Sequence, residues 1–186
     1  MKRTLLSWLP FAIVVTIAGW TAWLVVQQVY RSSANDPQIQ MAEDGAAKLG
    51  GGVLVPQVVP SETVDMARSL APYVIVYNEM GMPVSGSARL RGQIPTLPVV
   101  AIEAARRQPE LRLTWQPVPG VRSAVVVRHY GGANPGFLLA GRSLREIELR
   151  VRRFAGLLLL VWGASLVILL VYFGLATWLG RASYAR

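Results

Sequence analysis

Two long apolar stretches, one near each end, dominate the pattern of hydrophobic and polar positions along the chain. No Asp, Glu, Lys, Arg or His occurs from Thr4 to Tyr30 or from Phe154 to Gly180, so each stretch has 27 residues. At about 1.5 Å per residue, a helix of this length reaches roughly 40 Å, more than the ~30 Å hydrocarbon core of a bilayer. Both stretches are therefore predicted to be transmembrane helices.

Two other interpretations of these stretches fit less well. A core helix of a soluble domain normally has a polar face, which neither stretch shows. A cleavable signal peptide has an apolar run of about 7 to 15 residues, shorter than the run that follows Lys2 and Arg3. The predicted organisation is a signal-anchor span over residues 1–30, a domain over 31–153, a second span over 154–180 and a tail over 181–186.

Between the spans, the pattern predicts a mixture of short helices and strands. One helix is predicted from Asp36 to the glycines at 50–52, a second from Ser61 to Pro72, and a third between Pro98 and Pro109. Runs of β-branched and aromatic residues predict strands at 73–77, 84–90, 111–115, 121–130 and 137–140. The turn residues between the first two strands are a hairpin signal.

The last predicted element connects the domain with the second span. Ser143 and Glu146 have the spacing of a capping box, and an apolar stripe then continues into the second span without a breaker. A helix is stiff along its axis, so it could pass a small displacement of the sheet into the bilayer. The alternative is that this helix only anchors the domain.

The order of these elements resembles the extracytoplasmic PAS-like or single-Cache sensor domains of bacterial histidine kinases and chemoreceptors. Residues 71–84 (APYVIVYNEMGMPV) are similar to the first hairpin of such domains, and residues 139–146 (LAGRSLRE) to their exit into the second span. The resemblance implies an α+β fold with a central antiparallel sheet of about five strands, flanking helices, and a small-ligand pocket on one face. Unlike those kinases, the sequence continues for only six residues after the second span, so no kinase or output module is expected.

Basic residues outside the spans bear on the orientation of the chain. Two spans place both termini on one side of the membrane, and the basic residues of the two tails favour the cytoplasm. Arg152 and Arg153, next to the second span on its domain side, favour the opposite orientation. Together with the resemblance, the predicted location is the inner membrane, with cytoplasmic termini and residues 31–153 in the periplasm.

Composition narrows the classes of partner and of chemistry. The formal net charge of +9 fits attraction to anionic lipid or an acidic partner, or simply a solvated basic surface. Because the basic residues are dispersed along a membrane protein, we expect no nucleic-acid partner. The chain has no cysteine, which excludes disulfides, thiolate catalysis and metal sites built on cysteine.

The single histidine of the chain is the main candidate for a ligand contact. His129 lies between Arg128 and Tyr130 on the predicted strand 121–130, on the same face as Val125 and Val127. These three neighbours, Arg128, His129 and Tyr130, form the candidate ligand site, although a lone strand histidine is more often a satisfied or solvated residue. One histidine without cysteine predicts no metal site, and no nucleophile or phosphate-loop motif is present, so no catalytic residue and no cofactor are expected.

The spans contain residues typical of membrane interfaces and of helix packing. The predicted interface residues are Trp8, Trp23, Trp178, Arg152 and Arg153. Small residues four positions apart, which allow helices to approach closely, are Ala18 with Ala22 and Ala176 with Gly180. Neither span contains Asp, Glu, Lys, Arg or His, which argues against a proton relay or an ion path.

Two functions remain. The first is a non-enzymatic accessory subunit of a larger bacterial membrane complex, which contacts other membrane subunits and the lipid bilayer through its spans and its periplasmic domain. The alternative is a stand-alone periplasmic sensor that binds a small molecule and signals through a separate partner. An anchored binding protein for a small molecule or a lipid is a third, weaker hypothesis.

Overall fold

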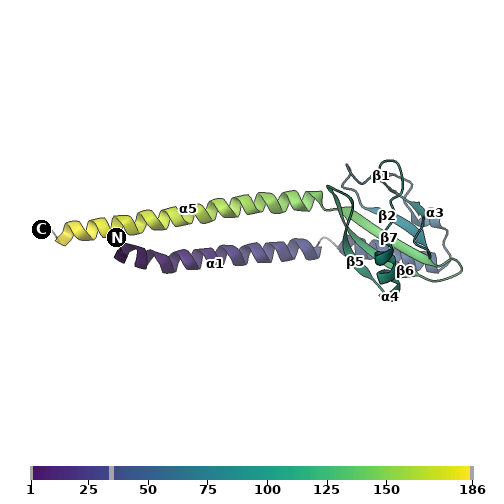
Figure 1. Cartoon of the computed structure of the whole chain (residues 1–186), viewed down its shortest axis with the longest axis horizontal. Helices are drawn as coiled ribbons and strands as arrows, with labels where there is room; N and C mark the ends of the chain where they lie inside the picture. Colours follow the sequence, from purple (N-terminus) through teal and green to yellow (C-terminus); the bar gives the residue numbers. More distant parts are fainter. Residues whose placement is uncertain (1, 34–35, 185–186) are drawn as a thin grey trace. The chain divides into compact units, whose positions relative to one another are not determined.

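The computed structural model describes residues 2–33 and 36–184, and the surroundings of side chains 8–29 and 37–179. It has two compact units, a helix pair within residues 1–30 and 149–186 and a sheet domain at 31–148. The elements in chain order are α1 (Lys2–Ser33), α2 (Asp36–Gly50), α3 (Val55–Val58), β1 (Val64–Asp65), β2 (Tyr73–Asn78), β3 (Pro83–Gly86), β4 (Ala88–Arg89), α4 (Val99–Arg107), β5 (Leu111–Val118), β6 (Val121–Tyr130), β7 (Gly136–Ser143) and α5 (Arg145–Tyr184) (Figure 1).

Helices α1 and α5 are long and apolar enough to cross a membrane, over Trp8–Val29 and Arg145–Leu179. Only 6% and 0% of their most apolar windows are buried, whereas a core helix of a soluble protein would be mostly buried. The chain thus has two candidate membrane spans that flank a sheet domain in the sequence, as the hydrophobic pattern predicted. Helix α5 starts well before the predicted second span and includes the charged segment at 145–153.

Within the helix pair, α1 and α5 run antiparallel and contact each other through a few specific side chains. The Trp162 indole N–H donates a hydrogen bond of 3.1 Å to the Thr16 hydroxyl, which in turn donates to the Ala12 carbonyl of its own helix. Farther along, the rings of Phe11 and Phe173 lie 5.5 Å apart. A tryptophan hydrogen-bonded inside a helix pair has its only polar group satisfied without water.

The sheet domain is built on a five-stranded antiparallel sheet, which confirms the predicted α+β class and strand number. The strand order is β3-β2-β7-β6-β5, so the two hairpins β2–β3 and β5–β6 lie on either side of β7, the last strand in the sequence. Strand β7 pairs with β6 along its full length and with β2 over residues 136–141. The edges of the sheet are β3 and β5.

Both faces of the central strands are covered, which explains why these strands are continuously apolar rather than alternating. Tyr73, Ile75 and Tyr77 of β2 face one cluster, which also contains Ile102 and Ala105 of α4. The intervening valines of β2 face a second cluster with Ala42, Ala46 and Leu49 of α2. Helices α2 and α4 therefore cover opposite faces of the sheet, and one-residue alternation along each strand determines which helix a side chain meets (Figure 1).

The predicted second helix, from Ser61 to Pro72, is wrong. Val64 and Asp65 instead form the short strand β1, which pairs in parallel with β4. The Asp65 carboxylate then accepts a hydrogen bond from the Ala67 N–H, which turns the chain. The spacing of apolar residues was compatible with a helix. The backbone groups of this segment instead form hydrogen bonds with β4 and with the Asp65 side chain, which a helix would not allow.

The predicted strand 84–90 is interrupted at Ser87. The Ser87 hydroxyl is buried and accepts a hydrogen bond of 3.0 Å from the Val74 N–H, while the Ser87 carbonyl accepts one from Val64. The chain thereby leaves the large sheet after Gly86, and β4 joins β1. A serine in a strand pattern gives no sequence signal for this exchange between sheets.

The start of α5 has one interaction of the kind that the predicted capping box requires. Ser143 is the last residue of β7, and its hydroxyl accepts a hydrogen bond from Arg145, two residues later. The Glu146 carboxylate pairs with Arg142 at 3.7 Å. Only Leu144 separates strand from helix, so β7 leads almost directly into α5.

Two buried tyrosines of β2 supply a matched test of this core. The Tyr77 hydroxyl donates to the Pro95 carbonyl at 2.9 Å, whereas the buried Tyr73 hydroxyl has no hydrogen-bond partner among the described residues. We expect Tyr77→Phe to lower the free energy of unfolding by about 1 kcal/mol, and Tyr73→Phe to leave it unchanged or raise it slightly. Pulse proteolysis of the full chain in urea measures both values, and equal losses would contradict the assignment.

The same tyrosines predict a loss of stability in alkali. Burial raises the pKa of both phenols well above the ordinary value of 10.0, and the nearby Tyr73 raises that of Tyr77 further. Above pH 10 the unfolded chain loses these protons while the folded chain keeps them, so the free energy of unfolding should fall by about 1.4 kcal/mol per pH unit for each tyrosine. Pulse proteolysis from pH 9 to 11 should show a shallower fall in either Phe variant.

Candidate functional site

The turn between β2 and β3 is held rigidly by one asparagine. The Asn78 side-chain oxygen accepts hydrogen bonds from the Met80 and Met82 N–H groups, at 3.0 and 2.9 Å. The Asn78 backbone also exchanges hydrogen bonds with Met82 and Gly81. Gly81 has φ of +78° and lies so close to Ile102 of α4 that a Cβ atom would come within 3.0 Å of it. This turn is therefore fixed by its own sequence and seated on α4.

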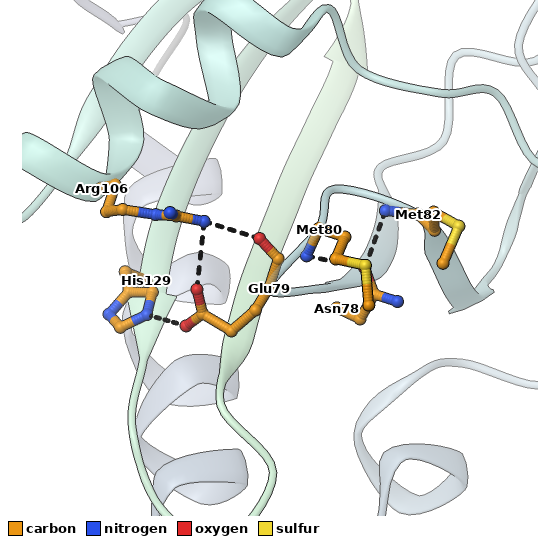
Figure 2. A network of polar contacts seen from close by, with 6 residues as sticks. All are labelled: Asn78, Glu79, Met80, Met82, Arg106 and His129. Atoms are coloured by element: carbon orange, nitrogen blue, oxygen red, sulfur yellow. Dashed lines mark hydrogen bonds and ion pairs between the residues drawn. The ribbon is translucent and has the colours of Figure 1, made fainter.

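A charged cluster binds the turn to two other elements. The Glu79 carboxylate lies between Arg106 of α4 and His129 of β6, with distances of 3.1 Å to Arg106 Nη2 and 2.5 Å to His129 Nε2. Arg106 also donates a hydrogen bond to the Glu79 carbonyl at 2.6 Å. Figure 2 shows both side chains pointing at Glu79, with Arg106 and His129 each next to a different oxygen of its carboxylate. The cluster joins a loop, a helix and a strand that are far apart in sequence.

The buried ring of Phe137 lies against the His129 and Arg106 side chains of this cluster. The His129 ring lies 5.1 Å from the Phe137 ring, and the Arg106 guanidinium lies 5.7 Å from it. Side chains of Glu79, Arg106 and His129 are 36–53% exposed, so each ion pair contributes little free energy on its own. Their main effect is positional, because they restrict the turn to one arrangement.

What this arrangement presents to solvent is apolar. Met80 is 81% exposed, Met82 53% and Val84, on the edge strand β3, 56%. We call these three residues the apolar hairpin tip. Exposed large apolar side chains are ordinary when scattered, but here they lie within five consecutive residues on a turn held by hydrogen bonds. A rigid apolar surface of this kind is suited to contact with another protein.

The structure separates the three residues of the predicted ligand site. His129 lies in the charged cluster, on the face of Val125 and Val127 as expected. Arg128 and Tyr130 lie on the opposite face, because neighbours on a strand alternate. They therefore do not form one site with His129.

Each of the two separated residues has a structural role. Arg128 forms ion pairs with Glu43 of α2 at 3.5 Å and with Glu110, which precedes β5, at 3.3 Å. Tyr130 is buried, which raises the pKa of its phenol, and the negative charge of Glu79 adds to that rise. Arg128 is thus engaged with carboxylates of other elements, and the Tyr130 side chain lies in the cluster beneath α2, on the other face of the sheet from His129.

No known protein-family model, curated protein or solved structure matches this chain. The resemblance to PAS-like and Cache domains therefore rests on the pattern of elements alone. The sheet face covered by α4, opposite α2, is occupied by core side chains that are almost fully buried, including Tyr73, Tyr77 and Leu139. The candidate site identified by geometry lies instead at the surface, on the hairpin turn.

The predicted packing residues of the spans face away from the α1–α5 contact. Ala18 and Ala22 of α1 are exposed, as is Ala176 of α5, whereas Gly180 lies outside the described side chains. The helices meet instead through residues that include Ala12 and Trp162. Of the predicted interface residues, Trp178, Arg152 and Arg153 are exposed and Trp8 and Trp23 are half-buried.

Sequence reasoning missed Glu79, Arg106 and both methionines of the turn. The turn itself was predicted, but its partner residues on α4 and β6 are 27 and 50 positions away from Glu79. One local signal was available, because a glycine between two methionines in a turn places apolar side chains where solvent is expected. Among the described residues, no three His, Asp or Glu side chains gather as a metal site would require.

Proposed function

We propose that this protein is a non-enzymatic accessory subunit of a larger bacterial membrane protein complex. In this proposal α1 and α5 cross the inner membrane, the termini are cytoplasmic, and the sheet domain contacts another subunit in the periplasm. The observation that supports it best is the apolar hairpin tip, three exposed apolar side chains on a turn fixed by Asn78 and Glu79.

The energetics of the tip favour a protein partner. Fully burying a methionine or valine side chain contributes about 1.5–3 kcal/mol. A mobile loop would lose much of this gain to ordering on association, but the turn here is already ordered by the Asn78 hydrogen bonds and the Glu79 ion pairs. The tip therefore presents a small preorganised contact surface.

The helix pair offers a second surface. Ala18 and Ala22 lie on the exposed side of α1, where small residues allow the backbone of a neighbouring helix to approach closely. Because these residues take no part in the contact with α5, they remain available to a helix of another subunit. A subunit with contacts in both regions would be held in a complex at two places.

The proposal is tested by purifying the tagged full chain from its native membranes in mild detergent and quantifying co-purifying proteins by mass spectrometry. A second subunit should be recovered at a fixed stoichiometry with the wild type. In the double variant Met80→Glu/Met82→Glu, recovery should fall about tenfold or more, because burying two charges in an apolar contact is strongly unfavourable.

The control is Leu54→Glu, which introduces one charge at another exposed apolar position, 67% exposed, outside the hairpin. This variant should retain the second subunit. Recovery of the wild type only as a monomer or homodimer would overturn the accessory-subunit proposal, and equal loss in both variants would overturn the role of the tip.

The second candidate function is a periplasmic receptor for a small anionic molecule. Two observations favour it: the Arg106 guanidinium and the His129 ring are half-exposed beside the turn, and the first turn of α5 is bound to the sheet domain. Glu148 of α5 pairs with Arg122 of β6 at 2.5 Å, and Arg145 donates to the Arg68 carbonyl at 2.7 Å. A thermal-shift screen of the full chain with small carboxylates tests it, since a true ligand should lose its effect in Arg106→Gln.

A further inference from the structure

The helix pair contains a groove between α1 and α5 with a volume of about 380 Å³. It is lined by Gly19, Trp20 and Trp23 of α1 and by Ala155, Leu158 and Trp162 of α5. The small residues Gly19 and Ala155 create the space, and the indole rings form its walls. The groove lies in the half of each span nearest the sheet domain in sequence, within residues 16–23 and 155–162.

The indoles indicate which kind of molecule fits this groove. Trp162 already donates to Thr16, but the N–H groups of Trp20 and Trp23 have no hydrogen-bond partner among the described residues. An unpaired N–H group in hydrocarbon is unfavourable by several kcal/mol, so an occupant should supply an acceptor. The ester carbonyls of a glycerophospholipid are acceptors that lie between its acyl chains and its phosphate.

Two arginines lie at the end of the groove nearest the sheet domain in sequence. Arg152 shares a face of α5 with the groove residue Ala155, three positions on, and with Leu159, seven positions on. Arg153 is adjacent. Both guanidinium groups are exposed, and neither forms an ion pair with another residue in the part of the chain that the structure describes. Arginines beside the end of an apolar groove are complementary to a phosphate headgroup.

We propose that this groove is a binding site for an anionic glycerophospholipid of the leaflet on the domain side. The phosphate pairs with Arg152 and Arg153, the ester carbonyls accept hydrogen bonds from Trp23 and Trp20, and one acyl chain lies along Ala155, Leu158 and Trp162. From Arg152 to Trp162 the helix rises about 15 Å, enough for a long segment of an acyl chain. This inference does not depend on the partner contact of the hairpin tip.

Native mass spectrometry of the full chain tests the site, with micelles that contain equal amounts of palmitoyl-oleoyl phosphatidylglycerol and phosphatidylcholine. The wild type should retain phosphatidylglycerol at least fivefold more often than phosphatidylcholine. Ala155→Phe, which fills the groove, should reduce retention of both lipids severalfold. Arg152→Gln/Arg153→Gln should keep the groove but retain the two lipids equally.

Two control variants match these changes. Ala164→Phe adds the same ring to an exposed position of α5 outside the groove, and Arg107→Gln removes a charge from α4. Both should behave as the wild type. Equal retention of the two lipids by the wild type, or unchanged retention in Ala155→Phe, would overturn the proposal. A lipid-free dimer that Ala155→Phe dissociates would assign the groove to a second copy of the chain and overturn it as well.

A measurement on the unmodified chain covers the case in which Ala155→Phe does not fold. In nanodiscs, brominated acyl chains quench tryptophan fluorescence at contact, so brominated phosphatidylglycerol should quench more strongly than brominated phosphatidylcholine at the same mole fraction. Equal quenching would contradict a selective anionic-lipid site.

Discussion

Gly136→Ala is expected to lower the free energy of unfolding of the sheet domain by about 3 kcal/mol, because overpacking against backbone cannot be relieved by a rotamer change. Gly136 begins β7 and pairs with both Asn78 and Tyr130. A Cβ atom there would overlap with the Tyr77 carbonyl oxygen and lie 2.9 Å from the Tyr130 hydroxyl. The central strand would have to move away from both neighbours.

Hydrogen exchange of the full chain in detergent measures this effect, since peptides of β2, β6 and β7 report the sheet domain separately from the spans. Gly131→Ala is the control within the same connection between β6 and β7. A Cβ atom at Gly131 meets no heavy atom within 4 Å, so this change should alter the free energy by less than about 0.5 kcal/mol. Similar protection in the two variants would show that the close approach at Gly136 is not constraining.

Phe137→Ala is expected to cost about 3–5 kcal/mol, the usual range for removing a buried aromatic ring. Phe137 is completely buried in the centre of the sheet, in the cluster beneath α4. Its ring also supports His129 and Arg106, the two side chains that fix Glu79. Loss of the ring should therefore also release the hairpin turn, with faster amide exchange at Met80 and Met82.

Glu79→Gln distinguishes the two expected effects of Phe137→Ala, the loss of core packing and the release of the hairpin turn. This change removes both ion pairs at the turn but leaves the core intact, so it should cost less than about 1 kcal/mol. Exchange at Met80 and Met82 should still become faster, while exchange in β6 and β7 stays slow. If Glu79→Gln destabilised the whole sheet as much as Phe137→Ala, the charged cluster would be a main source of stability rather than a positioning device.

Gly136→Ala and Phe137→Ala both change the central strand β7. This strand also connects the sheet domain, along the chain, with α5 of the helix pair. It begins at Gly136 between its two neighbours, includes Phe137 beneath the charged cluster, and leads within one residue into α5. The proposed lipid site includes α5, which continues from β7, and the hairpin tip follows β2, which pairs with β7. Measuring lipid retention in Met80→Glu/Met82→Glu would show whether the two proposed sites are independent.

The sequence pattern predicted an element correctly where the physical cause of that element lies within the same segment. An uninterrupted apolar run has to avoid water along its whole length, so the two spans could be predicted from residues 4–30 and 154–180 alone. Runs of apolar β-branched residues, as in β2 and β6, reflect burial on both faces, and such runs predicted the individual strands. Their assembly into one antiparallel sheet was implied by the resemblance to PAS-like domains. The Asn78 turn was likewise a local signal.

Tertiary structure alone decided which side chains meet. Alternation along β6 separates His129 from Arg128 and Tyr130, while α4 and the β2–β3 turn bring Arg106 and Glu79 to it from distant positions. The exit of the chain at Ser87 converts a predicted helix into a strand, because a partner strand was available only in the folded domain. In the helix pair, helix rotation turns Ala18 and Ala22 outward and places Trp162 beside Thr16. Such contacts depend on the relative rotation and register of whole elements, which no single segment of sequence determines.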